Sequence, residues 1–247
     1  MFGDSPMSKG YIIFQRLLEA KARVQYNASY ARMYRKRDDT GRQETSHRDL
    51  GKFVDELTRH LQAKALVLDL GCGTGRYFHC IRRPVHLVGL DLSPEMLREA
   101  QHPVDAGRLA HHVPLVCGSL FAAPFKGHCF DAIYCIGILG HHIPLEEQVL
   151  QQVYDLLKPG GLFGFTVDAA DSPRATSWRH ELAQRLRPMV PKRLRPWLDT
   201  RLHEFRVQED ELEQLLQGSP FQESKWWRRY SPTGRIDFVI IARAHKA

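Results

Sequence analysis

Residues 65–91 read ALVLDLGCGTGRYFHCIRRPVHLVGLD, and this stretch decides the fold. It begins with a short apolar run, residues 65–70, which predicts a buried strand, and the run ends in a glycine-rich turn at Gly71–Gly75. We expect a helical stretch over about 76–82 and then a second strand, 86–91, which ends in an acid. A strand, a glycine-rich turn, a helix and a strand in this order are typical of a parallel βαβ unit that binds a ligand.

The rest of the chain continues the alternation of strands and helices. Ser93 and Pro94 supply an N-cap and a first helical position, so a helix start is expected there. The remaining strands are expected at 115–117, 130–137, 162–167, 221–230 and 235–243, and the remaining helices at 96–100, 146–157 and 209–217. We therefore predict an α/β fold, a Rossmann-like seven-stranded and mainly parallel sheet with helices on both faces and an antiparallel C-terminal hairpin.

Composition predicts a soluble, cytoplasmic protein of one domain. Of the 247 residues 43% are hydrophobic and 26% charged, no apolar run approaches the about 20 residues of a membrane span, and the first residues do not resemble a secretory signal. The five cysteines form no CxxC pair and show no zinc-ligand spacing, so we expect reduced core thiols and no metal ion. The net charge of +7 is concentrated between residues 174 and 206, where nine basic residues face three acidic ones.

The glycine turn indicates a ligand that lies against the main chain. Gly71, Gly73 and Gly75 allow backbone conformations that side chains forbid, and amides at a following helix start can hydrogen-bond the ligand. A dinucleotide site would require a third glycine where Arg76 stands. Asp91 suits the hydroxyls of a ribose in either case, so it does not separate an adenosyl ligand from a dinucleotide.

Four tracts in order resemble the class I S-adenosylmethionine-dependent methyltransferases, in their broad small-molecule group. They are VLDLGCGTG at 67–75, GLDLSPEML at 89–97, FDAIYCIGILGHH at 130–142 and LKPGG at 157–161. The resemblance covers about 65–167 and implies that the cofactor is S-adenosyl-L-methionine. It also implies a helical lid over 1–61, a cofactor-binding core over 62–169, a basic helical cap over 170–207 and a C-terminal helix and hairpin over 208–247.

The resemblance further implies which residues bind the cofactor. Asp69 and the three glycines would hold its methionine part, and Asp91 its ribose. Ser119 stands where the family commonly has an acid that contacts the adenine amino group, and this change weakens one contact. The expected cofactor-binding residues are Tyr26, Asp69, Gly71, Gly73, Gly75, Asp91, Leu92, Met96, Ser119, Leu120, Cys135 and Ile136.

The acceptor side of the site is predicted from three other segments. The tyrosines Tyr26, Tyr30 and Tyr34 recur every four residues on one helix face, which either packs on the domain or forms a lid; Tyr30 and Tyr34 would then contact the acceptor. His141 and His142 are the candidate general bases, although a histidine here also occurs as a shape-forming residue. Trp178 and Trp197 would line the pocket beneath the basic cap.

We expect methyl transfer to oxygen or nitrogen of a small or medium-sized acceptor, in which some arginines meet an anionic group. Two alternatives stay open. The basic segment could track phosphates, and the FDAIYCIGILGHH tract also resembles enzymes that methylate a carboxylate on the wobble uridine of tRNA, so an RNA site is the second hypothesis. A cofactor-binding regulatory protein without catalysis is the third.

Overall fold

The computed structural model describes residues 9–40, 45–109, 112–172, 189, 205–232 and 234–246. Trp178, Trp197 and nearly all of the basic segment 174–206 lie outside the described residues. The division of the chain into lid, core, cap and C-terminal part therefore stays a prediction.

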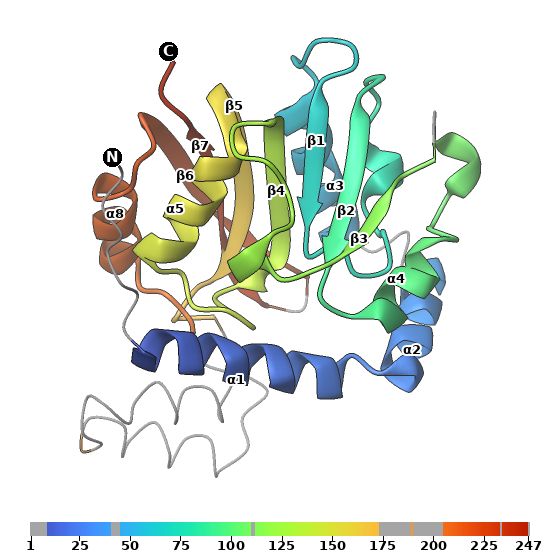
Figure 1. The fold of residues 1–247 in the computed structure, drawn as a ribbon, viewed down its shortest axis with the longest axis horizontal. Coiled ribbons are helices and arrows are strands. Elements are labelled where there is room, and N and C mark those ends of the chain that lie inside the picture. Colours follow the sequence, from blue (N-terminus) through green and yellow to red (C-terminus); the bar gives the residue numbers. More distant parts are fainter. Residues whose placement is uncertain are drawn as a thin grey trace.

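One sheet of seven strands organises the molecule, in the order β3-β2-β1-β4-β5-β7-β6 (Figure 1). The strands are β1 (Leu66–Leu70), β2 (His86–Asp91), β3 (Leu115–Cys117), β4 (Phe130–Leu139), β5 (Leu157–Asp168), β6 (Glu223–Tyr230) and β7 (Ile236–Arg243). The first five strands are parallel, whereas β7 runs antiparallel to both β5 and β6. The predicted fold class and the antiparallel hairpin are confirmed.

Helices cover both faces of the sheet, and Figure 1 shows α5 in front of it and α3 behind. The helices are α1 (Lys9–Gln25), α2 (Ala28–Thr40), α3 (Thr45–Thr58), α4 (Pro94–Ala100), α5 (Glu147–Leu156) and α8 (Glu209–Gln217). Apolar residues of α3 and α4 pack in one core cluster, and those of α5 and α8 pack in another. None of the described helices is long and apolar enough to cross a membrane.

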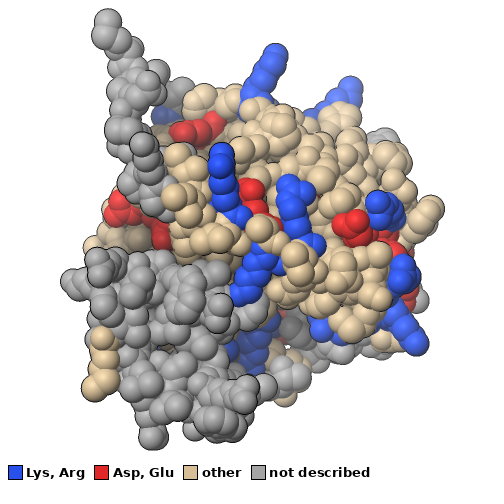
Figure 2. Space-filling view, turned by 60° about the horizontal axis from the view of Figure 1, so that its bottom comes forward, with Lys and Arg blue, Asp and Glu red and all other residues tan. Residues whose placement is uncertain are grey.

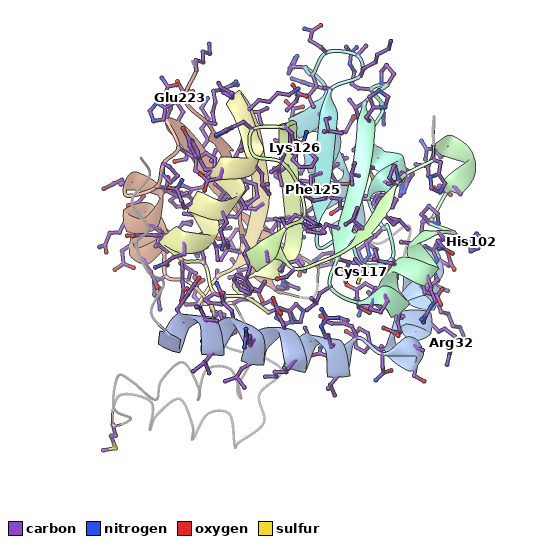
Figure 3. All side chains as sticks on the ribbon, viewed as in Figure 1. Arg32, His102, Cys117, Phe125, Lys126 and Glu223 are labelled. Atoms are coloured by element: carbon purple, nitrogen blue, oxygen red, sulfur yellow. The ribbon has the colours of Figure 1, made fainter. Side chains whose placement is uncertain are left out.

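Helix α1 lies across the end of the sheet where the parallel strands finish, and α2 lies at one corner of that end, next to α4 (Figure 1). Figure 3 labels Cys117 at this end, at the close of β3, and Glu223 at the opposite end, where β6 begins. A parallel sheet binds its ligands beyond the carboxyl ends of the strands. The two N-terminal helices are therefore placed over the expected ligand site.

Three local expectations were wrong. The helix expected over 76–82 is only a 3-10 turn, Phe78–Cys80, because Pro84 disfavours helical backbone before it and β2 begins two residues later. The tyrosine stripe is not one helix, since Tyr26 lies between α1 and α2 and Asn27 caps the new helix by accepting from the amides of Ser29 and Tyr30. The KPGG tract lies inside β5, at a register shift, rather than before it.

The core is set by alternation along the strands. Successive residues of β4 point to opposite sides, so Ile133 and Cys135 join the cluster under α5 while Ala132 and Tyr134 join the cluster under α3. Phe163 of β5 is fully buried and stacks on Phe165, with ring centroids 4.4 Å apart. Both faces of the central strands are thus buried, as a parallel sheet requires.

We predict that Phe163→Ala lowers the free energy of unfolding by about 3–5 kcal/mol, because it leaves a cavity among packed side chains. Ile13→Ala removes a side chain that is 60% exposed on α1, and it should change stability by less than about 0.5 kcal/mol. Urea unfolding followed by circular dichroism measures both. Similar losses in the two variants would contradict the packing described for β5.

Candidate functional site

A cavity of about 900 Å³ lies between the ends of the parallel strands and the helices α1 and α2. Its floor contains the glycine turn after β1 and the segments that follow β2, β3 and β4, and its far end reaches the β6–β7 hairpin. This volume is at the upper end of the range for small-molecule pockets, which is about 300–1,000 Å³. The cavity therefore has room for two ligands side by side.

Asp91, at the end of β2, ties the glycine turn to the start of α4. Its Oδ2 accepts from the amide of Gly73 at 2.8 Å, and its Oδ1 accepts from the amide of Ser93 at 2.8 Å. Gly71 and Gly73 have positive φ, and a Cβ on Gly71 would lie 2.6 Å from the side chain of Ile138. The turn is thus held open and close to the cavity by backbone geometry that only glycine supports.

Two buried carboxylates face the cavity floor. Burial raises the pKa of Asp69 to about 8, and the carboxylate of Asp91 contributes to the shift. Burial also raises the pKa of Asp91, although the hydrogen bonds from Ser93 and Gly73 act against it. Since desolvated carboxyls favour a positively charged partner, this floor suits a cationic ligand group together with hydroxyl donors.

Helix α2 is anchored to the glycine turn by a third buried acid, Asp38, which is 1% exposed. The hydroxyl of Thr74 and the guanidinium of Arg76 both hydrogen-bond this carboxylate, the Arg76 Nε at 2.6 Å. The Arg76 guanidinium also lies 4.6 Å from the ring centroid of Tyr34, and Arg37 lies at the same distance from that ring. The position of α2 therefore depends on the glycine turn beneath it.

An apolar slot with a polar end continues from Asp91 toward β3. Asp91 pairs with Cys117 in the sheet, and its carbonyl accepts from the amide of Gly118 at 3.0 Å, so the residues after β3 lie beside it. The slot is lined by Leu92, Met96, Leu120 and Phe121. At its polar end the hydroxyl of Ser119 donates to a carboxylate oxygen of Glu19 in α1.

The tyrosines and His142 form a connected aromatic group over the middle of the cavity. The rings of Tyr26 and Tyr30 meet edge to face at 5.0 Å, and Tyr30 stacks on Tyr34 at 5.8 Å. The hydroxyl of Tyr26 hydrogen-bonds Nε2 of His142. The carbonyl of Tyr26 accepts from the Ser93 hydroxyl at 2.7 Å, so one residue joins α4 to the loop after β4.

His141 belongs to a different network, which extends across β5 to the C-terminal hairpin. Its Nδ1 lies 3.5 Å from Oδ2 of Asp168, whose other oxygen accepts from Arg235. Arg235 also donates from Nε to Asp237 at 2.8 Å, and Asp237 pairs with Arg229. Although burial acts to raise the pKa of Asp168, hydrogen bonds and charge from His141 and Arg235 lower it.

Exposure separates the members of this network. The side chains of Asp168 and Asp237 are 7% and 2% exposed, whereas those of His141 and Arg235 are each 42% exposed. The buried acids thus hold an imidazole and a guanidinium at the cavity wall. Such a wall can bind an anionic group and can take up a proton.

An irregularity in β4 places the histidines. The pairing of β4 with β5 shifts between Cys135 and Leu139, and Gly137 there has a φ of 74°. The amide of Gly137 donates to the hydroxyl of Thr166 at 2.9 Å instead of to a ladder carbonyl. Bulges of this kind commonly re-aim side chains near ligand sites.

Most of the residues expected from the sequence line this one cavity. They are Tyr26, Tyr30, Tyr34, Asp69, Gly71, Gly73, Asp91, Leu92, Met96, Ser119, Leu120, Ile136, His141 and His142. Gly75 lies behind the turn, where a Cβ would be 2.6 Å from the ring of Phe78, and Cys135 is buried in the core under α5. Their roles toward a ligand stay predictions.

Sequence reasoning missed Glu19, Asp38, Asp168, Arg229, Arg235 and Asp237. Asp168 ends β5 on the same sheet edge as Asp69 and Asp91, so the strand-end position of an acid was a usable signal. The other residues come from the lid and the hairpin, which only the tertiary structure brings to the cavity. Among the described residues, no group of His, Cys, Asp and Glu side chains is arranged to hold a metal ion.

The outer surface around the lid is basic. When the bottom of Figure 1 is turned forward, Lys and Arg side chains lie across the middle of that face (Figure 2). Exposed basic residues on α1 and α2 include Arg16, Arg23, Arg32, Lys36 and Arg37. A positive surface near a cavity raises the local concentration of anionic ligands.

Comparison with known families finds that a model described as a methyltransferase domain matches residues 67–161. A demethylmenaquinone methyltransferase of Lactiplantibacillus plantarum is 38% identical over 105 residues, which cover 41% of this chain and 44% of that protein. A sterol 24-C-methyltransferase of Candida albicans is 35% identical over 107 residues, covering 42% of this chain and 28% of that protein. The matched segment thus spans less than half of each of these two relatives.

Solved structures share the fold at low sequence identity. A Haemonchus contortus phosphoethanolamine N-methyltransferase in complex with S-adenosyl-L-methionine aligns with a TM-score of 0.64 and 13% identity, covering 100% of this chain and 62% of that chain. A Bacillus halodurans protein described as a methyltransferase aligns with a TM-score of 0.55 and 18% identity, covering 79% of this chain and 100% of that chain.

We predict that Asp38→Ala lowers the free energy of unfolding by about 3 kcal/mol, because it leaves the partly buried Arg76 without its carboxylate. Glu56→Ala is the control, since Glu56 of α3 is 51% exposed in its side chain and pairs with Arg59, whose side chain is 54% exposed. The control should lose less than about 1 kcal/mol. Chemical unfolding measures both, and equal losses would show that Asp38 does not anchor α2.

Proposed function

We propose that residues 67–161, which match a model described as a methyltransferase domain, form a class I S-adenosylmethionine-dependent methyltransferase domain, and that the whole protein transfers a methyl group to a small or medium-sized acceptor with an acidic or anionic group. One observation supports this most directly. A single cavity runs from the glycine turn and Asp91 to the exposed heads of His141 and Arg235, so donor and acceptor would lie in the same cavity.

The donor half of the cavity fits S-adenosyl-L-methionine. Asp91 is fixed by two backbone amides and keeps lone pairs for the hydroxyls of a ribose. Asp69, with its raised pKa, gains most from a neighbouring ammonium such as that of the methionine part. The slot formed by Leu92, Met96 and Leu120 suits a flat purine.

When bound, the cofactor supplies a methyl group on a positively charged sulfur, which is open to displacement by a nucleophile. The chain's own contribution is then to align the acceptor and to exclude water. Helices α1 and α2 cover the cavity, and the ring cluster of Tyr26, Tyr30 and Tyr34 provides apolar surface above it. Aromatic faces also favour a neighbouring positive charge.

The acceptor half supports an acidic substrate. Arg235 is held by Asp168 and Asp237 with its guanidinium at the cavity wall, where it can meet a carboxylate or a phenolate. His141 turns Nδ1 toward Asp168, which leaves Nε2 as the nitrogen that can accept a proton from an acceptor hydroxyl or ammonium. We therefore propose His141 as the base and assign His142 to the lid contact with Tyr26.

The named relatives do not narrow the reacting atom. By name they act on demethylmenaquinone and on carbon 24 of a sterol, and the structural relative acts on an amine. Transfer to oxygen or nitrogen is proposed here because a base and a guanidinium face the acceptor space. The tRNA hypothesis gains no support from these relatives, and the basic segment that suggested it lies outside the described residues.

We predict that S-adenosylhomocysteine binding at pH 7 releases close to one proton. Asp69 has a pKa of about 8 and is mostly protonated at pH 7, whereas a bound ammonium lowers its pKa and ionises it. At pH 9 the carboxyl is already ionised, so the release should disappear. Calorimetry in buffers of different ionisation enthalpy measures the number of protons.

Asp69→Asn serves as the control for this measurement, since it removes the titrating group and keeps the side-chain size. It should abolish the proton release and weaken binding. Binding of wild type with a buffer-independent enthalpy at pH 7 would argue against Asp69 as the partner of the ammonium.

We predict that His141→Ala and Asp168→Asn each lower kcat by about a hundredfold or more, because they remove or misorient the base. His142→Ala should instead weaken cofactor binding, since it loses the Tyr26 contact.

Transfer of a labelled methyl group to a panel of carboxylic acids, phenols and amines identifies the acceptor and measures these variants. Total tRNA at low salt is a further arm of this experiment. Near-normal turnover in His141→Ala would exclude it as the base, and labelling of tRNA alone would overturn the small-molecule proposal.

A further inference from the structure

A carboxylate from the lid reaches the end of the slot after β3. Glu19 lies on the side of α1 that faces the cavity, together with Ala22 three residues further along, and Tyr26, just after the end of the helix, lines the same cavity. One of its oxygens, Oε1, accepts the hydroxyl of Ser119, which comes from a segment 100 residues away in sequence. This contact places a negative charge at a point where the β3 segment itself offers none.

Ser119 is poorly available to a ligand. Its hydroxyl proton goes to Glu19, and its Oγ also accepts from the amide of Phe121 at 3.0 Å. A hydroxyl has one proton and two lone pairs, so only one lone pair is left. Ser119 therefore acts chiefly as the group that fixes Glu19.

Glu19 itself keeps an unused oxygen. Within the part of the chain that the structure describes, no residue donates a hydrogen bond to its Oε2, while the side chain lines the cavity. A carboxylate oxygen beside an apolar slot is a strong acceptor for an N–H group at the edge of a flat ring. An ether or carbonyl oxygen at the same place would be repelled.

The location of Glu19 along the slot indicates which part of the cofactor would lie beside it. On the proposed function Asp91 marks the ribose, and Asp91 pairs in the sheet with Cys117, two residues before Ser119; Leu92 and Met96 line the same cavity. We propose that Glu19 accepts a hydrogen bond from the exocyclic 6-amino group of the cofactor's adenine, so that a residue of α1 recognises the base. This inference rests on the proposed function, because it takes S-adenosylmethionine as the ligand of the slot.

The arrangement gives α1 a direct part in ligand recognition. Most of the donor half is built from segments of the sheet edge, but Glu19 belongs to a helix that lies across that edge (Figure 1). Glu19 can then recognise the adenine only while α1 lies in this position. Selection for the 6-amino group accordingly depends on the position of α1.

A thermodynamic cycle between the side chain and the base tests this proposal. Calorimetry measures S-adenosylhomocysteine and its analogue with hydrogen in place of the 6-amino group, each with wild type and with Glu19→Ala. For wild type, removal of the amino group should weaken binding about ten- to hundredfold, as expected for a hydrogen bond to a charged group. Glu19→Ala should weaken S-adenosylhomocysteine by a similar factor and bind the two ligands equally.

Two further variants control the cycle. Glu19→Gln keeps the size of the side chain and an uncharged acceptor, so it should retain part of the preference for the amino group. Glu213→Gln makes the same charge change on the exposed surface of α8 and should leave both affinities unchanged. Circular dichroism verifies that all variants fold.

The outcomes separate the two proposals. If wild type binds S-adenosylhomocysteine and Glu19→Ala keeps the full preference for the 6-amino ligand, the role of Glu19 is overturned and the proposed function stands. If wild type binds neither ligand, the proposed function fails, and the inference about Glu19 fails with it.

Discussion

The carboxylate of Asp91 accepts hydrogen bonds from two backbone amides, and the ligand site depends on this interaction. It joins the glycine turn after β1 to the start of α4 after β2, and these are the two places where the main chain leaves the sheet beside the cavity. Because the carboxylate is buried, each hydrogen bond that it accepts from an amide is strong. Loss of the acid would leave these two amides without this partner. Tyr26, which lies between α1 and α2, is attached to this unit because its carbonyl accepts a hydrogen bond from the Ser93 hydroxyl.

The sequence could predict the donor half because that half is local. The glycine turn, the acid at the end of β2 and the cap of α4 each lie within a few residues of a strand end, where spacing and turn chemistry report the geometry. The mainly parallel sheet with helices on both faces followed from the alternation of strands and helices. The helix expected over 76–82 failed because Pro84 and the early start of β2 left too little chain for it.

The acceptor half could not be predicted in the same way because its residues meet only through long-range packing. Arg235 and Asp237 belong to the last strand and its approach, yet they complete a network with Asp168 because β7 pairs antiparallel with β5. Glu19 reaches Ser119 only because α1 crosses the sheet edge. The sequence shows that these side chains are charged, but it does not show which residues they pair with.

Tyr26 spans the boundary between these halves, with its carbonyl held by Ser93 and its hydroxyl held by His142. The length of one rigid side chain therefore sets how far the start of α4 lies from the loop after β4. A tyrosine ring cannot stretch or fold, so this separation resists distortion from either side. On the proposed function, the hairpin and the loop after β4 could differ for another acceptor while the spacing that Tyr26 sets between the start of α4 and that loop is kept.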